Sequence, residues 1–164
     1  MSRLEAVLGD ITRESVDAIV NAANPALGRG GGVCGAIFAA AGPGLDEACA
    51  ALGGCGTGDA KATPGFALPA RWIIHTVGPV WQGGDQGEPD QLAAAYRRCL
   101  EVADELGARS IALPAISTGI YGYPLEGATD IAVATMSRTP SAVEQVRFVC
   151  FDDRTLAAYQ QRLG

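Results

Sequence analysis

The chain contains two apolar segments that each end in a glycine-rich loop and then continue into a helix. In the first, Val20–Pro25 leads into Gly28–Gly35, and in the second, Ser110–Leu113 leads into the loop Pro114–Gly122. Glycines let backbone N–H groups approach a phosphate closely, and a helix N-terminus adds a favourable dipole. Two such strand–loop–helix units in one short chain indicate a ligand with two linked phosphates.

Strand and helix patterns alternate along the whole chain. Short apolar segments predict strands at Leu4–Leu8, Ala18–Asn21, Asp59–Thr63, Trp72–Val77, Ser110–Leu113 and Val146–Phe151. Helical spacing of apolar residues predicts helices at Gly35–Ala41, Gly44–Leu52, Gln91–Leu106, Leu125–Ser137 and Thr155–Leu163. This alternation indicates an α/β fold with a mostly parallel sheet and helices on both faces. Ligands bind such sheets beyond the carboxyl ends of the strands, where both glycine loops fall.

The composition narrows the classes of ligand and partner. The 164 residues suit a single domain, and 48% hydrophobic content is typical of a globular chain. The formal net charge is −6 and no run of Lys or Arg is present, so we expect neither nucleic-acid binding nor membrane binding. Backbone N–H groups and helix dipoles must therefore hold an anionic ligand.

The cysteines do not form a disulfide or metal-binding pattern. Their number is odd and no CxxC spacing occurs among Cys34, Cys49, Cys55, Cys99 and Cys150. We therefore expect reduced thiols, no metal and no other cofactor. The first five residues lack the apolar stretch of a signal peptide, and no apolar run is long enough to span a bilayer, so we expect a cytoplasmic protein.

Three polar residues at strand ends are candidates for ligand contact. Asp10 can accept a hydrogen bond from an exocyclic amine such as adenine N6, and its structural alternative is a helix cap. Asn21 and Asn24 end the second strand, and their amides suit sugar hydroxyls because each offers donors and acceptors. Bonding to the local backbone is an equal alternative for Asn21, whereas we expect Asn24 to contact the ligand.

The single histidine and two aromatic residues each have a structural alternative as well. His75 is embedded in an apolar strand, which favours a buried, hydrogen-bonded core residue over a catalytic one. Tyr121 can pack on a ribose or plug its own loop, and Phe151 can stack on a base or complete the core. The run Gly30–Gly32 lacks the GxGxxG pattern, so it does not predict a dinucleotide-binding Rossmann fold.

In combination, these segments resemble the macrodomain family. The matching segments follow one another in the same order along the chain: Gly9–Thr12, Val16–Asn24, Gly30–Val33, Ile74–Pro79 and Pro114–Pro124. The chain looks closest to the MacroD-type branch, whose members remove ADP-ribose from proteins and deacetylate O-acetyl-ADP-ribose. The resemblance implies a three-layer α/β/α sandwich, formed by residues 1–164 as a single macrodomain, with an ADP-ribose cleft.

The resemblance also implies roles for individual residues at the adenine end of this cleft. Asp10 would hold the adenine amine, and Ile11 would line the adenine pocket. Phe151 would stack on adenine, with Asp152 close by.

Further residues are implied to bind the diphosphate and the distal ribose. The backbone of Gly31, Gly32 and Val33 would bind the diphosphate. The second glycine loop would close over it from the other side, through Ser117, Thr118, Gly119, Ile120 and Tyr121. Asn24 would bind the distal ribose hydroxyls, with Asn21 and Ala22 beside it as ligand contacts.

Position 34 departs from the pattern of the MacroD-type branch. The branch has Val-Asp-Gly-x-Ile-His-Arg after the glycines, but here Cys34 stands at the acidic position, and Phe38 and Ala39 replace the His-Arg pair. A free thiol is mostly protonated at neutral pH, and loss of a general base typically costs ~10²–10⁴ in rate. Asp59 stands where relatives often have a histidine or an acid, and we expect it to be a solvated surface residue.

We therefore expect an enzyme that binds ADP-ribose and hydrolyses mono-ADP-ribose from acidic side chains of modified proteins. Asn24, loop amides and a substrate phosphate oxygen would hold and activate the water, so that no carboxylate at position 34 is needed. A non-catalytic ADP-ribose reader and an O-acetyl-ADP-ribose deacetylase are the alternatives, and Cys34 as a nucleophile is a further one. The expected partners are ADP-ribose and mono-ADP-ribosylated proteins, and the expected state is a monomer.

Overall fold

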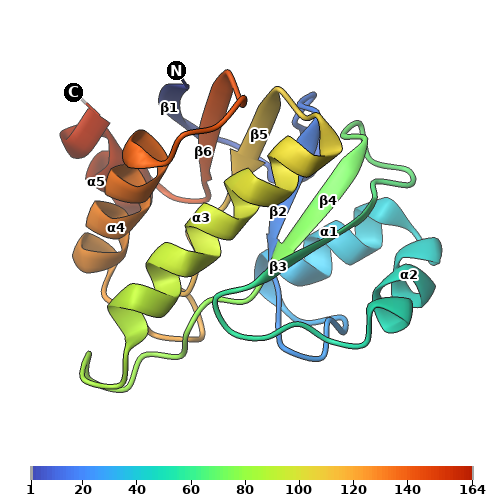
Figure 1. Ribbon diagram of the computed structural model, residues 1–164, viewed down its shortest axis with the longest axis horizontal. Helices are drawn as coiled ribbons and strands as arrows, with labels where there is room; N and C mark the ends of the chain where they lie inside the picture. The colour runs from blue at the N-terminus through green and yellow to red at the C-terminus, as the bar shows by residue number, and fades with distance from the viewer. Residues whose placement is uncertain (1, 164) are drawn as a thin grey trace.

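The structure is a computed structural model that describes residues 2–163 (Figure 1). Its strands are β1 (Arg3–Leu8), β2 (Ala18–Ala22), β3 (Ala60–Pro64), β4 (Trp72–Thr76), β5 (Ser110–Leu113) and β6 (Gln145–Cys150). Its helices are η1 (Ile11–Arg13), α1 (Gly32–Ala41), α2 (Gly44–Leu52), α3 (Glu88–Leu106), α4 (Leu125–Arg138) and α5 (Asp153–Leu163). Every predicted strand and helix is present.

The six strands form one mixed sheet in the order β1-β6-β5-β2-β4-β3. All neighbouring strands pair in parallel except β3, which is antiparallel to β4. β2 lies in the middle of the sheet between β5 and β4, and its Asn21 pairs with His75 of β4. The mostly parallel mixed sheet predicted from the sequence is confirmed.

Helices cover both faces of the sheet, and alternate strand residues pack against each layer. Val20 and Ile74 point into a core that contains residues of α3, α4 and α5. Ile19 and Ile73, one position earlier on the same two strands, point into a second core that contains residues of α1 and α2. Period-two alternation of this kind is the pattern of a sheet buried on both sides. The three-layer α/β/α sandwich is therefore confirmed (Figure 1).

Three helices begin earlier than their apolar spacing predicts, and one of them, α5, begins at Asp153 rather than at Thr155. α1 begins at Gly32 rather than at Gly35: its first turn contributes Val33 and Cys34 to the core beneath it, but the run of glycines before them predicts a loop. α3 begins at Glu88 rather than at Gln91, with Pro89 in its first turn. Proline suits that position because its missing N–H has no intrahelical partner there.

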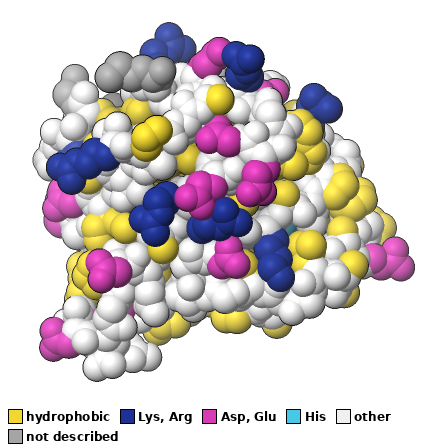
Figure 2. All heavy atoms as spheres, viewed as in Figure 1, with side chains coloured by type: hydrophobic (Ala, Val, Ile, Leu, Met, Phe, Trp, Pro, Cys, Tyr) yellow, Lys and Arg dark blue, Asp and Glu magenta, His cyan; other side chains and the backbone are white. Residues whose placement is uncertain are grey.

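The face that carries α3 has a mixed charge distribution. Figure 2 shows acidic and basic side chains interspersed over it. On α3, Arg98 pairs with Asp59 through Nε at 3.0 Å and with Glu101 through Nη1 at 2.9 Å. Within residues 2–163, no helix is long and apolar enough to cross a membrane.

Candidate functional site

Two adjoining cavities lie at the carboxyl ends of the strands. The larger is about 650 Å³ and lies between the loop after β1, the start of α1, the loop after β5 and the start of α5. The smaller is about 330 Å³ and lies between the residues after β2, the start of α1 and the loop after β5. Both are lined by Gly32, Val33, Ala115 and Gly119, so they form one continuous cleft. Its size suits a small-molecule ligand.

The loop after β1 places a charged carboxylate at the rim of the larger cavity. Asp10 Oδ1 accepts hydrogen bonds from the backbone N of Thr12 at 3.0 Å and from Thr12 Oγ1 at 2.6 Å. These bonds, from the hydroxyl first and then the amide, lower the pKa of Asp10, as does nearby Arg13. Asp10 therefore caps η1, as the structural alternative predicts. Its Oδ2 lies 3.9 Å from Arg13 Nε and takes no part in the Thr12 bonds.

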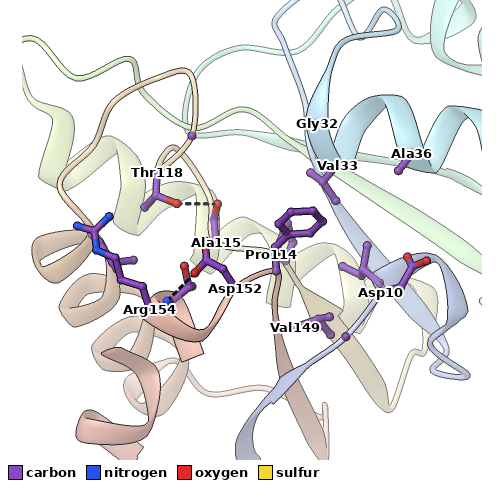
Figure 3. A pocket seen from close by; sticks show the side chains of 16 residues that line it. Asp10, Gly32, Val33, Ala36, Pro114, Ala115, Thr118, Val149, Asp152 and Arg154 are labelled. Carbon is purple, nitrogen blue, oxygen red and sulfur yellow. Dashed lines mark hydrogen bonds between the residues drawn. The ribbon is translucent and has the colours of Figure 1, made fainter. Parts of the chain in front are cut away.

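The start of α5 forms the opposite side of the larger cavity. Figure 3 shows Asp152 and Arg154 across the cavity from Asp10. Asp152 Oδ1 accepts a hydrogen bond from the backbone N of Thr155 at 2.8 Å, and this bond lowers the pKa of Asp152. Phe151 also lines this cavity, and its side chain is 95% exposed. An aromatic ring left in solvent beside a cavity is available to stack on a planar ligand.

The first turn of α1 lies between the two cavities. Its N-cap, Gly31, has no side-chain cap bond among the described residues, so no side chain satisfies the first N–H groups of the helix, and Gly32 and Val33 of this turn line the cleft. Gly32 has φ +56, in the left-handed region that glycine adopts at low cost. Gly35 allows the loop to pack closely, since a Cβ there would lie 2.6 Å from the Gly30 carbonyl oxygen. This helix N-terminus can bind an anion.

The loop after β5 forms the other wall of the cleft. Ser117 has φ +67, which is unfavourable for a residue with a side chain. Ile116 donates its backbone N–H to Tyr96 Oη at 3.2 Å, which ties the loop to α3. A Cβ at Gly78 would overlap Ser117 Oγ, so only glycine at the end of β4 admits this loop shape.

Asn24 lies in the smaller cavity with its amide held in one orientation. Its Nδ2 donates to the Gly28 carbonyl at 3.0 Å, and its Oδ1 accepts from the Gly28 backbone N at 3.0 Å. An amide has two donor hydrogens and two acceptor lone pairs. One of each therefore remains for a ligand hydroxyl or a water.

Cys34 lines the same cavity and is 5% exposed. Its Sγ donates to the Gly28 carbonyl at 3.6 Å and accepts from Asn21 Nδ2 at 3.7 Å. Among the described residues that line the smaller cavity, none is Asp, Glu, His, Lys or Arg. This end of the cleft therefore lacks a carboxylate or imidazole that could act as a general base.

Asn21 and His75 form a buried polar chain beside Cys34. Asn21 Nδ2 donates to His75 Nδ1 at 3.0 Å, and His75 Nε2 donates to Thr63 Oγ1 at 2.9 Å. His75 is fully buried, and desolvation lowers its pKa to about 4, so the ring is neutral. The prediction of a core histidine is confirmed. Asn21 is 1% exposed and lines neither described cavity, and its amide bonds the side chains of His75 and Cys34 rather than the local backbone, so its role differs from both alternatives.

The structure brings the other predicted site residues to the cleft. The larger cavity is lined by Asp10, Ile11, Gly32, Val33, Thr118, Gly119, Phe151 and Asp152. The smaller cavity is lined by Ala22, Asn24, Gly31, Gly32, Val33, Cys34, Ser117, Gly119, Ile120 and Tyr121. Asp59 lines neither described cavity and pairs instead with Arg98 on the surface, as expected.

Sequence reasoning missed several residues of the cleft wall. Among them are Ala36, Gly78, Leu125, Arg154 and Thr155. Three of them could have been found from the sequence, because they lie at the ends of predicted strands or helices, where this cleft forms. Gly78 follows a predicted strand, Leu125 begins a predicted helix, and Thr155 begins another.

Comparison with known proteins identifies the class of protein that this fold and cleft define. A family model named Macro domain matches residues 20–132, and the chain belongs to this family. A macro domain-containing protein of Chlorobaculum tepidum is 56% identical over 164 residues, covering 98% of this chain and 95% of the relative. An O-acetyl-ADP-ribose deacetylase of Salmonella newport is 54% identical over 169 residues, covering 99% and 94%.

Solved macrodomain structures have the same architecture. The Oceanobacillus iheyensis macrodomain with ADP is similar with a TM-score of 0.94 and 43% identity, covering 99% of this chain and 90% of that one. The Trypanosoma brucei macrodomain in complex with ADP-ribose has a TM-score of 0.90 and 42% identity, covering 98% and 69%.

Proposed function

We propose that this macro domain binds ADP-ribose and hydrolyses the ester between mono-ADP-ribose and acidic side chains of modified proteins. The observation that carries the proposal is the order of groups along one continuous cleft. An exposed aromatic ring and a carboxylate lie at one end, an uncapped helix N-terminus lies in the middle, and an oriented amide lies at the other end. That order matches a base, a diphosphate and a sugar.

Adenine fits the larger cavity. The ring of Phe151 offers a face for stacking, and Asp10 Oδ2 can accept a hydrogen bond from the adenine amine. The aliphatic side chains of Ile11 and Val149 line the same cavity.

The diphosphate fits the middle of the cleft. Arg154 is the one cationic side chain among the described lining residues of the two cavities, so the backbone must supply most of the positive potential. The first turn of α1 and the loop Ser117–Gly119 lie on opposite walls of the cleft. Their N–H groups and the dipole of α1 favour a phosphate group there.

Hydrolysis takes place at the end that Asn24 occupies. A water bound to the remaining donor and acceptor of Asn24 lies next to the distal ribose. Since no carboxylate or imidazole lines this end in the described chain, a phosphate oxygen of the substrate takes the proton from the water. Oriented water and a nearby base are the two requirements of this chemistry.

Deacetylation of O-acetyl-ADP-ribose is a second candidate function. It is favoured by the 54% identity to the Salmonella newport protein that carries the name O-acetyl-ADP-ribose deacetylase. Both substrates are esters of the distal ribose, and both release ADP-ribose and a carboxylic acid. The same water position at Asn24 serves both reactions.

Incubation with two substrates tests the proposal. The protein is mixed separately with a glutamate-mono-ADP-ribosylated protein and with O-acetyl-ADP-ribose, and free ADP-ribose is followed by chromatography. We expect release from both, with an Asn24→Ala variant much slower on each. Release from O-acetyl-ADP-ribose alone makes the protein a deacetylase. Binding of ADP-ribose with no release from either substrate contradicts hydrolysis and makes the protein a reader.

A further inference from the structure

A buried carboxylate organises the loop that precedes α3. Glu88 is 1% exposed and accepts three backbone hydrogen bonds: from Gln82 at 2.7 Å, from Gly84 at 3.0 Å and from Gln86 at 2.7 Å. Desolvation raises the pKa of this carboxyl, but the backbone N–H groups outweigh it, and the pKa falls to about 2. The loop 82–86 is therefore folded around a permanent negative charge.

Trp81 immediately precedes this loop and contacts the wall of the cleft. The backbone N of Trp81 donates to the Tyr121 carbonyl at 2.8 Å. The indole packs against the ring of Tyr123 with centroids 4.6 Å apart. The indole also packs closely against Gly84, where a Cβ would lie 2.9 Å from the indole Cη2. Trp81 thus links the loop that Glu88 organises to the loop after β5.

The loop after β5 needs support from outside because its own conformation is unfavourable. Ser117 holds φ +67, and such residues persist only where the surrounding structure imposes them. The Tyr123 N–H donates to the Ser117 carbonyl at 2.9 Å, and the Gly122 N–H donates to the Gly119 carbonyl at 3.0 Å. Trp81 therefore holds Tyr121 and Tyr123, which bracket the end of this loop.

We propose that Glu88 is a positioning residue for the ligand, although it lines neither described cavity. Its carboxylate holds loop 82–86, and through Trp81 it presets the loop Ser117–Gly122 against the diphosphate and distal ribose. This inference rests on the proposed binding of ADP-ribose in the cleft. A purely structural role, as an acidic residue in the first turn of α3, would affect all ligands equally.

Glutamine at position 88 is the sharpest perturbation. It keeps the shape of the side chain, but one of its two polar atoms becomes an NH₂ donor. That donor faces backbone N–H groups, so at least one of the three bonds is lost and the loop loosens. Glu105→Gln on the same helix is the matched control, since Glu105 is exposed.

Calorimetric titration with ADP-ribose and with AMP tests the proposal. AMP lacks the distal phosphate and ribose, so it does not depend on the full length of the Ser117–Gly122 wall. We expect Glu88→Gln to raise the Kd for ADP-ribose by roughly ten-fold and to change the Kd for AMP by less than about two-fold. Glu105→Gln changes neither value.

A second variant keeps the test decisive if Glu88→Gln folds poorly. Trp81→Ala leaves Glu88 in place but removes the indole, and we expect the same selective loss of ADP-ribose affinity. The proposal is overturned if both variants bind ADP-ribose as tightly as wild type. It is also overturned if both variants lose affinity for ADP-ribose and AMP equally. Hydrolysis is not used in this test, so a wild-type protein that binds ADP-ribose without cleaving its esters contradicts the proposed reaction and leaves the role of Glu88 standing.

Discussion

Two substitutions at Gly32, to Gln and to Glu, test whether a phosphate group binds at the middle of the cleft, because their side chains have nearly the same shape and differ in charge. Gly32 lies in the first turn of α1 and lines both cavities. Apart from its two chain neighbours and the adjoining backbone of α1, no atom of the described residues lies within 4 Å of a Cβ built there, so a side chain has room. The backbone has φ +56, and a side chain in the left-handed region costs roughly 1–2 kcal/mol. We expect Gly32→Gln and Gly32→Glu to fold with similar, slightly lowered Tm values.

The two variants differ only in the charge placed near the diphosphate. With an effective dielectric constant of about 20, two unit charges repel by about 4 kcal/mol at 4 Å and by about 2 kcal/mol at 8 Å. Gly32→Glu should therefore bind ADP-ribose roughly 30- to 1000-fold more weakly than Gly32→Gln, since each 1.4 kcal/mol is about ten-fold.

Calorimetric titration of both variants with ADP-ribose at low and high salt provides the measurement. The difference between the variants should shrink as salt is added, because exposed charges are screened. Equal affinities for the two variants at low salt, with both proteins folded, would show that no phosphate lies at this helix N-terminus.

Two further predictions concern the carboxylate at the rim and the buried histidine. Asp10→Ala should weaken ADP-ribose binding by about 1.5–3 kcal/mol, the range for hydrogen bonds to charged groups, and unchanged affinity by calorimetry would remove Asp10 from the ligand site. Because the pKa of His75 is lowered from 6.5 to about 4, the unfolded chain takes up a proton first as the pH falls. The full stabilisation from the neutral His75 ring is present above the pKa of histidine in the unfolded chain. The free energy of unfolding measured with urea should therefore be about 2 kcal/mol lower at pH 5 than at pH 7.5. His75→Gln should flatten this dependence by the same amount, and an equally steep profile in the variant would refute the assignment.

The sequence predicts the sheet and the cleft well for a physical reason. Apolar strands that end in glycines place their loops at one edge of a parallel sheet, and chain order alone then brings Gly32 and Gly119 together. The single-domain boundary and the monomeric state stay predictions.

Asn21 shows what a single sequence does not reveal. It lies inside β2, where its partner His75 belongs to a neighbouring strand more than fifty positions away. The register between two strands depends on packing across the sheet, so the sequence pattern left two alternatives open. Glu88 shows a second limit, because its partners are backbone N–H groups, which have no signature in the sequence.

The turnover of a Cys34→Ala variant tests the central claim most directly, namely that ester hydrolysis in this cleft needs no base or nucleophile from the protein. ADP-ribose release from a glutamate-mono-ADP-ribosylated protein is measured for wild type and variant at saturating substrate, with ADP-ribose affinity determined in parallel. We expect the two rates to agree within about three-fold, whereas removal of a general base costs ~10²–10⁴. Loss of release on the latter scale, with the affinity for ADP-ribose preserved, would contradict the account and make the Cys34 thiol the catalytic group.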